Sequence, residues 1–332
     1  FDPWGRRLAQ FGGVRNGRSF GGGEHDRTYW CEGSLAVWPP DGALRMTGLV
    51  QAVIDGLLVG GVYAVISIGL TLVFGVLGIV NFAQAEFLML GMYIAYFAWA
   101  LLGLDPLLGA FVAFGVAFVL GYWLQRTVVQ RVMKAPPVAQ VFLTVGLLIV
   151  MENGALLGFG SQIRSVSTAY QSASLQLGPF FISLPYLYAF LMSIVSGTAL
   201  WWVLHRSWLG LAIRATAADP MAGRLIGINI ERTMALAFGL GVGLTALGGA
   251  VVLPYLSASP TAGSQFVVLM FTVAVVGGLG SIPGAVVGGL VVGVITSVSA
   301  LLFPIQLQNL ILFLVFIAIL ALKPDGLMGR TQ

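Results

Sequence analysis

Nine long apolar stretches, separated by short polar segments, run from residue 49 to residue 322 and limit what this chain can fold into. A helix needs about 20 mostly apolar residues to cross a bilayer, and eight of the stretches are close to that length. Those eight cover roughly 86–102, 107–124, 138–160, 186–204, 233–253, 264–280, 284–303 and 305–322. The pattern predicts an all-α, polytopic integral membrane protein.

The low charge of the chain supports this interpretation. Only 8% of the residues are charged, whereas a soluble globular domain carries about 25%. So few charges cannot cover a water-exposed surface, which excludes a cytosolic enzyme, a nucleic-acid-binding protein and a disordered chain. The single cysteine, Cys31, excludes an intrachain disulfide.

The first apolar stretch, residues 49–80, is longer than one simple crossing requires. It contains six glycines, among them those at positions 60, 61, 69, 75 and 78. Since glycine weakens a helix, we expect one span followed by a broken or re-entrant piece. Counting the stretch once gives nine crossings, and about 8–10 transmembrane helices fit the pattern. Whether the number of crossings is even or odd decides the side of the membrane on which Met46 lies, and the sequence leaves that number open.

Residues 1–45 differ from the remainder of the chain. They hold 11 charged residues, Cys31 and short runs of glycine and proline, and they contain no apolar window as long as a signal-peptide core. Met46 directly precedes the first long apolar stretch. We therefore expect the transmembrane domain to cover 46–332, with 1–45 as a mis-assigned upstream extension; a genuine flexible tail is the alternative.

The basic residues predict the orientation. Ten lysines and arginines follow Met46, and nine of them fall on one side of the predicted map, in 125–137, in the long loop 205–232 and at the C-terminus. Only Arg164, in loop 161–185, falls on the other. Because cytoplasmic loops carry an excess of lysine and arginine, the side with loop 205–232 is predicted to be cytoplasmic.

Two segments interrupt the apolar pattern with groups that could line a path. Residues 81–86 form a polar patch ending in Glu86, either an exposed turn or a break facing a path; ionisable groups inside spans are functional candidates. The run from Gly277 to Gly284 contains Pro283, which lacks an N–H and ends a helix. That run is either a tight turn between two spans or a broken helix beside a path.

The histidines, cysteine and acids form no catalytic or metal-binding pattern, so we expect no enzyme activity, no cofactor and no metal.

Loop 205–232 is predicted to contain a short cytoplasmic helix. Thr216 or Asp219 can cap it, Pro220 suits its first turn, and Gly227 ends it, which places the helix at about 220–226. A helix this short is marginal alone, so it favours docking to a partner. The alternative is a plain connector whose charges set the topology.

These segments together resemble branched-chain amino-acid ABC transporter permeases. The resemblance covers 46–332 and rests on residues 63–87 with their Asn-Phe-Ala-x-x-Glu, on 214–229 and on 277–284; length and the first motif favour the H-type subunit. It implies a coupling segment that binds the ATPase and a translocation path. The implied coupling residues are Arg214, Ala217, Ala218, Asp219, Pro220, Gly223, Arg224, Gly227 and Asn229. The implied path residues are Asn81, Phe82, Gln84, Glu86, Gly277, Gly278, Gly280, Ser281 and Pro283.

The resemblance also implies the partners. These are two ATP-binding subunits, a second homologous permease subunit, a periplasmic or extracellular amino-acid-binding protein docking on loop 161–185, and the lipid bilayer of a bacterial inner membrane. The family commonly has His-Gly where this chain has Gln84-Ala85, which slightly favours an alternative substrate class, urea or short amides. An ion-coupled secondary transporter is the alternative from another class; Glu86 and Glu152 are its only support.

Overall fold

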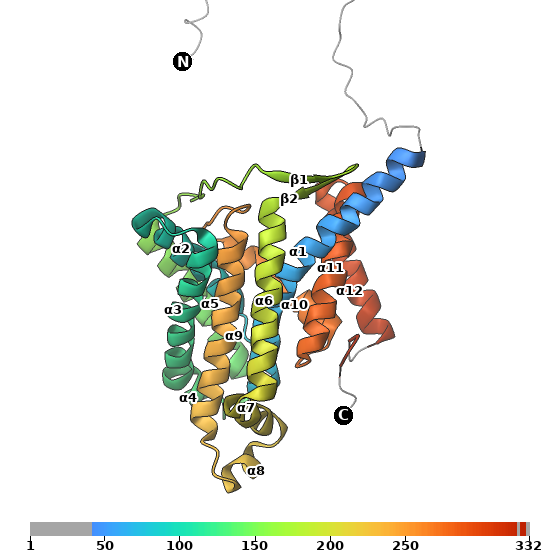
Figure 1. The fold of residues 1–332 in the computed structure, drawn as a ribbon. Helices are drawn as coiled ribbons and strands as arrows, with labels where there is room; N and C mark the ends of the chain where they lie inside the picture. The colour runs from blue at the N-terminus through green and yellow to red at the C-terminus, as the bar shows by residue number, and fades with distance from the viewer. Residues whose placement is uncertain (1–41, 324–325, 330–332) are drawn as a thin grey trace, which may run out of the picture. The chain divides into compact units, whose positions relative to one another are not determined.

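The structure is a computed structural model that describes residues 42–323 and 326–329. Apart from a two-stranded sheet, its regular elements are helices (Figure 1). The elements are α1 (Gly42–Leu77), α2 (Gln84–Leu102), α3 (Pro106–Leu124), the π-helix η1 (Gln125–Val129), α4 (Gln130–Val132), α5 (Pro137–Phe159), β1 (Ser174–Leu177), β2 (Phe180–Ser183), α6 (Leu184–Arg206), α7 (Trp208–Ala218), α8 (Pro220–Leu225), α9 (Ile230–Val252), α10 (Ala262–Gly277), α11 (Ile282–Leu302) and α12 (Ile305–Leu322).

The prediction of a polytopic all-α membrane protein is confirmed. Among the described residues, seven helices are long and apolar enough to cross a membrane, and 262–277 and 310–322 are shorter apolar helices. Together they correspond to the nine predicted stretches, with ends that differ by a few residues. The agreement follows from the bilayer itself, since its thickness sets the length of an apolar helix.

The expectation of a break within 49–80 is wrong. Helix α1 continues for 36 residues, about 54 Å at 1.5 Å per residue, and it runs obliquely through the bundle (Figure 1). It ends only at Gly78, whose φ of 68° is left-handed. Helix α1 begins at Gly42, so it includes the last residues of the polar N-terminal segment; the rest of that segment, 1–41, lies outside the described residues.

The α1 glycines serve close helix packing rather than a break. A Cβ at Gly60 would overlap the α11 backbone at Gly289, and a Cβ at Gly293 would overlap the α1 backbone at Gly60. A Cβ at Gly69 would likewise overlap the carbonyl of Gly241 in α9. Small residues let membrane helices approach closely because lipid supplies no hydrophobic force between them. Helix α1 therefore packs closely on both α9 and α11.

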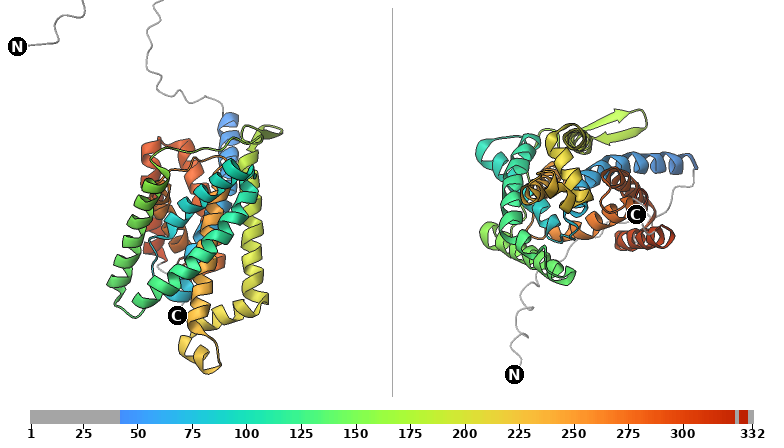
Figure 2. Two further views of the ribbon diagram at one scale, coloured as in Figure 1. Left: turned by 90° about the vertical axis from the view of Figure 1, so that its left-hand side faces the viewer. Right: turned by 90° about the horizontal axis from the view of Figure 1, so that it is seen from below.

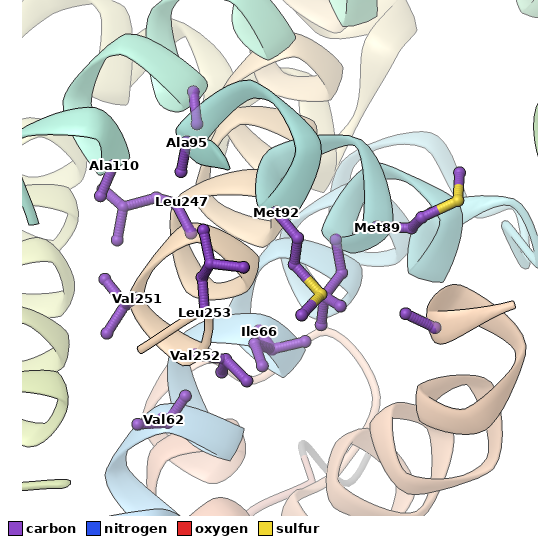
Figure 3. Close-up of a cluster of buried hydrophobic side chains, with 14 of the residues drawn as sticks. Val62, Ile66, Met89, Met92, Ala95, Ala110, Leu247, Val251, Val252 and Leu253 are labelled. Atoms are coloured by element: carbon purple, nitrogen blue, oxygen red, sulfur yellow. The ribbon is translucent and has the colours of Figure 1, made fainter. Parts of the chain in front are cut away.

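The core lies around α9, in which 19 of 23 residues are buried. Its Leu247 and Val251 belong to the same cluster as Ile66 of α1 and Met92 of α2 (Figure 3). Helix α5 is the opposite case: only two of its 23 residues are buried. It lies at the outside of the bundle (Figure 2). Stacking of Phe159 on Tyr93, at a centroid distance of 4.4 Å, joins α5 to α2.

The two ends of the bundle are formed by different elements. Helices α4, α7 and α8 lie at one end, and β1 and β2 lie at the other (Figure 1). Helix α1 starts at the hairpin end, where the side-chain amide of Gln51 donates to the Phe181 carbonyl over 2.6 Å. Helix α12 ends on the side of α7 and α8 (Figure 1), which fits an odd number of crossings.

The β1–β2 hairpin is an element that the sequence did not predict. Its strands pair antiparallel, with Ser174 opposite Ser183, around Gly178, which has a φ of 63°. Leu175 and Phe181 are exposed on it. The alternation of apolar and polar residues in 174–177 is the signal that could have revealed a strand.

Candidate functional site

The polar segment 81–86 forms a buried hydrogen-bond network where α1 meets α2 and α9. The side-chain amide of Asn81 donates to Oε1 of Gln84 over 3.0 Å. Nε2 of Gln84 donates to Oγ1 of Thr245 over 2.7 Å and to the Gly241 carbonyl over 3.1 Å. Asn81 and Gln84 are each 1% exposed. These two predicted path residues therefore hold the start of α2 against the middle of α9.

The local sequence explains this placement. Gly78 ends α1 in a left-handed conformation, and the chain then turns back towards α9. Oδ1 of Asn81 accepts from the N–H of Ala83 over 3.2 Å, the local turn that asparagine favours. Gly69 leaves room for the Gln84 side chain, because a Cβ there would contact its Nε2.

Removing the amide of Gln84 is expected to destabilise the protein. The substitution Gln84→Leu leaves the buried Asn81 amide and Gly241 carbonyl without this partner, at a cost of about 1–3 kcal/mol in the free energy of unfolding. Thermal unfolding of the detergent-purified protein measures the effect. Gln176→Leu, on the exposed face of the hairpin, is the control; equal losses of stability in the two variants would contradict the role of the network.

Phe82 and Glu86 point to a different helix. The ring of Phe82 lies 5.0 Å from that of Phe271, in the middle of α10. Glu86, in the first turn of α2, is fully buried, and neither of its carboxylate oxygens has a hydrogen-bond partner among the described residues. Its carboxylate lies against Gly263, where a Cβ would overlap it. Of the two alternatives that the sequence left open for 81–86, the exposed turn is therefore wrong. Glu86 is a buried acid beside the start of α10.

The glycine-rich run 277–284 is a tight turn between α10 and α11. Gly278 and Gly280 have φ values of 106° and 84°. Gly277 and Gly284 approach so closely that a Cβ on either would overlap the backbone of the other. Oγ of Ser281 accepts from the N–H of Gly284 over 3.2 Å and caps α11. Of the two alternatives that the sequence left open, the structure contains the turn.

This turn contacts two further parts of the chain. Gly280 lies against Gly75, near the end of α1. The C-terminal residues 326–329 cover the end of α10: the N–H groups of Leu327 and Met328 donate to the carbonyls of Val276 and Gly277 over 2.8 and 3.0 Å. Those carbonyls belong to the last turn of α10, which has no partner within the helix. The sequence offered no signal for this contact.

Helix α10 brings the predicted path residues into one line. Glu86 lies at its start, Phe82 at its middle, and the turn with Gly277, Gly278, Gly280, Ser281 and Pro283 at its end. Its 16 residues separate Glu86 from the turn by about 20 Å. Asn81 and Gln84 are not in this line, because the Gln84 side chain donates to α9 and the Asn81 side chain donates to Gln84.

The predicted cytoplasmic helix is present as α8. Oδ1 of Asp219 accepts from the N–H groups of Met221 and Ala222 over 2.7 and 3.1 Å, and Gly227 follows with a φ of 87°. Asn229 then caps α9, its Oδ1 accepting from Arg232 N–H over 3.0 Å. Thr216 is not a cap: it is buried inside a preceding helix, α7, which the sequence did not predict.

Helix α7 anchors the segment. Oγ of Ser207 accepts from the N–H of Gly210 over 3.0 Å, and Gly210 packs directly on the backbone of Leu204 at the end of α6. Ile213 is buried in the core cluster that includes α9. The coupling residues predicted from the sequence, except Gly223, are exposed on α7, α8 and the adjoining turns.

An exposed apolar patch accompanies these residues. Met221, Leu225 and Ile226 are 77%, 87% and 74% exposed, and Trp208 at the start of α7 is 81% exposed. Arg214 and Arg224 are exposed beside them. We call Met221, Leu225 and Ile226 the α8 patch. Large apolar side chains grouped at a polar end of a membrane protein are typical of a protein–protein contact.

Comparison with known proteins identifies the family. Residues 52–320 match the family described as "Branched-chain amino acid transport system / permease component". The chain belongs to this family. It is similar to the high-affinity branched-chain amino acid permease protein BraD of Pseudomonas aeruginosa, with 32% identity over 296 residues, 85% of this chain and 96% of BraD. No solved structure matches the chain significantly.

Two further relatives carry the name LivH. The high-affinity branched-chain amino acid permease protein LivH of Escherichia coli K12 is 28% identical over 296 residues, 85% of this chain and 96% of the relative. The probable branched-chain amino acid permease protein LivH of Methanocaldococcus jannaschii is 26% identical over 293 residues, 84% of this chain and 92% of the relative. This chain is thus a multi-pass membrane permease component of a transport system.

Proposed function

We propose that this permease is the transmembrane subunit of an ATP-driven ABC importer and forms the translocation path for branched-chain or related amino acids. The family match and the names of the relatives support the substrate class. The observation that carries the coupling role is the α8 patch, which is held rigidly by the Asp219 cap and by α7 yet leaves three large apolar side chains in water.

The α8 patch supports coupling to a separate ATP-binding subunit. Burying one such side chain contributes about 1.5–3 kcal/mol to association, and Arg214 and Arg224 can pair with acids on the partner. Two ATP-binding subunits would hold one such segment from each of two permease subunits, this chain and a homologous one. Closing of the ATP-binding subunits would then move α7 and α8, and with them the ends of α6 and α9.

The path is proposed to follow α10, since Glu86, Phe82 and the glycine turn lie along it. Asn81 and Gln84 would support the path by fixing the start of α2. The hairpin end, with exposed Leu175 and Phe181, would receive the amino-acid-binding protein outside the plasma membrane of a bacterial cell. The excess of basic residues at the α8 end supports this orientation.

Uptake in proteoliposomes tests the proposal. The permease is reconstituted with candidate ATP-binding subunits, a second permease and an amino-acid-binding protein from the same organism, and radioactive leucine is added with the binding protein. We expect ATP-dependent accumulation of leucine. Accumulation of urea but not of leucine would replace the substrate class, and leucine uptake driven by a proton gradient without ATP would contradict the ABC mechanism.

A further inference from the structure

The most unusual group that the fold leaves unexplained is the carboxylate of Glu86. It is fully buried, and neither oxygen has a hydrogen-bond partner in the part of the chain that the structure describes. Leaving an acid unpaired in a membrane-spanning region is costly, and such groups mark substrate or ion pathways.

The start of α10 lies directly beside this carboxylate. Gly263 is the second residue of α10, and any side chain there would overlap Glu86. The first N–H groups of a helix have no partner within the helix, and the helix dipole makes that end positive. The side chain of Thr261, at the N-cap, makes no capping hydrogen bond to the described N–H groups of α10. In the same turn, Ser264 and Gln265 are exposed while Ala262 and Gly263 are buried, so the turn borders the surface of the bundle.

We propose that Glu86 and the first turn of α10 form the site where the permease holds a zwitterionic amino acid during passage. The carboxylate of Glu86 receives the α-ammonium group. The N–H groups of the first turn of α10 that follow Ala262, whose own N–H donates to the Ser259 carbonyl over 3.0 Å, receive the α-carboxylate, as helix N-termini receive anions. Because Gly263 has no side chain, the Glu86 carboxylate can lie directly against the first turn of α10. The two binding groups are then close enough to hold the ammonium and the carboxylate of one amino acid.

This inference rests on the proposed function and sharpens its substrate class. A neutral amide such as urea has no cation for Glu86, and a simple carboxylic acid is repelled by Glu86. The apolar side chain of the amino acid has no part in the recognition, so the site selects zwitterions in general and leaves the choice among them to the binding protein.

Ligand-dependent thermal unfolding of the purified, reconstituted complex without binding protein tests the site. The added probes are leucine, 4-methylpentanoate, which lacks the ammonium group, and 3-methylbutylamine, which lacks the carboxylate. Leucine is expected to raise the unfolding temperature of the wild type, with a much smaller rise for the two probes. Equal stabilisation by leucine and 4-methylpentanoate would overturn the role of Glu86.

Variants separate the site from a structural role. Glu86→Gln keeps the shape and removes the charge, so leucine uptake is expected to fall roughly 10-fold or more while ATP hydrolysis continues. Glu86→Asp is expected to retain part of the uptake. If Glu86→Gln does not assemble, Gly263→Ala tests the site instead, because its methyl group displaces the Glu86 carboxylate and should lower leucine uptake. Gly115→Ala, in open space on α3, is the control and should not lower uptake.

The outcomes distinguish the two levels of the proposal. Wild-type leucine uptake in Glu86→Gln, or in Gly263→Ala where Glu86→Gln does not assemble, overturns the zwitterion site and leaves the importer function intact. Absence of leucine uptake in the assembled wild-type complex overturns the importer function itself.

Discussion

Replacing Met221, Leu225 and Ile226 with serine is expected to uncouple the permease from its ATP-binding subunit. The three side chains are between 74% and 87% exposed, so their loss leaves the fold of the permease unchanged. Burying each in an interface contributes about 1.5–3 kcal/mol, and losing the three together should weaken the association by roughly 1000-fold or more. Co-purification of the ATP-binding subunit with tagged permease, and ATP-dependent leucine uptake, measure the effect.

The matched control changes exposed leucines at the opposite end of the molecule. Leu101 and Leu102, at the end of α2, are 78% and 71% exposed, and their replacement with serine should leave co-purification unchanged. Deleting 217–227 is the stronger variant of the same test. Normal association and uptake in the triple-serine variant would show that the ATP-binding subunit contacts another surface.

Introducing a branched side chain at Gly293 is expected to prevent folding. A Cβ at this position would overlap the backbone of Gly60 and the carbonyl of Gly56 in α1. Backbone atoms cannot move aside as a flexible side chain can, so Gly293→Val should force α11 away from α1. Overpacking of side chains alone costs about 1–3 kcal/mol, and a clash with backbone should exceed that range.

The measurement for Gly293→Val is the yield of monodisperse protein in size-exclusion chromatography, followed by its unfolding temperature. Gly115→Val is the control, because no atom lies within 4 Å of a Cβ at Gly115. We expect little folded Gly293→Val protein and a normal yield of Gly115→Val. A wild-type unfolding temperature for Gly293→Val would mean that α1 and α11 are not held together by this contact.

The spans and the α8 helix could be predicted because their causes are local. The length of an apolar stretch is limited by the bilayer, and the Asp219-Pro220 start and Gly227 end of α8 act through the backbone of adjacent residues. The glycines of 49–80 misled the prediction, since glycine both weakens a helix and permits close packing. Whether a glycine breaks a helix or serves its packing depends on whether another helix occupies the space beside that glycine.

The candidate site shows the same division. Its polar residues could be selected from the sequence, because polar groups within apolar stretches are rare and costly. Their roles could not, since Gln84 turns to α9 while Glu86 turns to α10 only two residues later. The contact of residues 326–329 with the end of α10 joins segments that are distant in the sequence, and no local pattern indicates it.

The amino-acid sequence by itself determined that this chain is a multi-pass helical protein, where its spans lie, and that a capped helix interrupts its longest basic loop. These properties follow from residue polarity, from bilayer thickness and from neighbouring backbone groups. Only the tertiary structure decided that α1 is continuous, that 277–284 is a turn, and that Glu86 lies unpaired beside the first turn of α10. Each of these depends on which helix packs against which, because close contacts between distant segments determine what a glycine or an acid does.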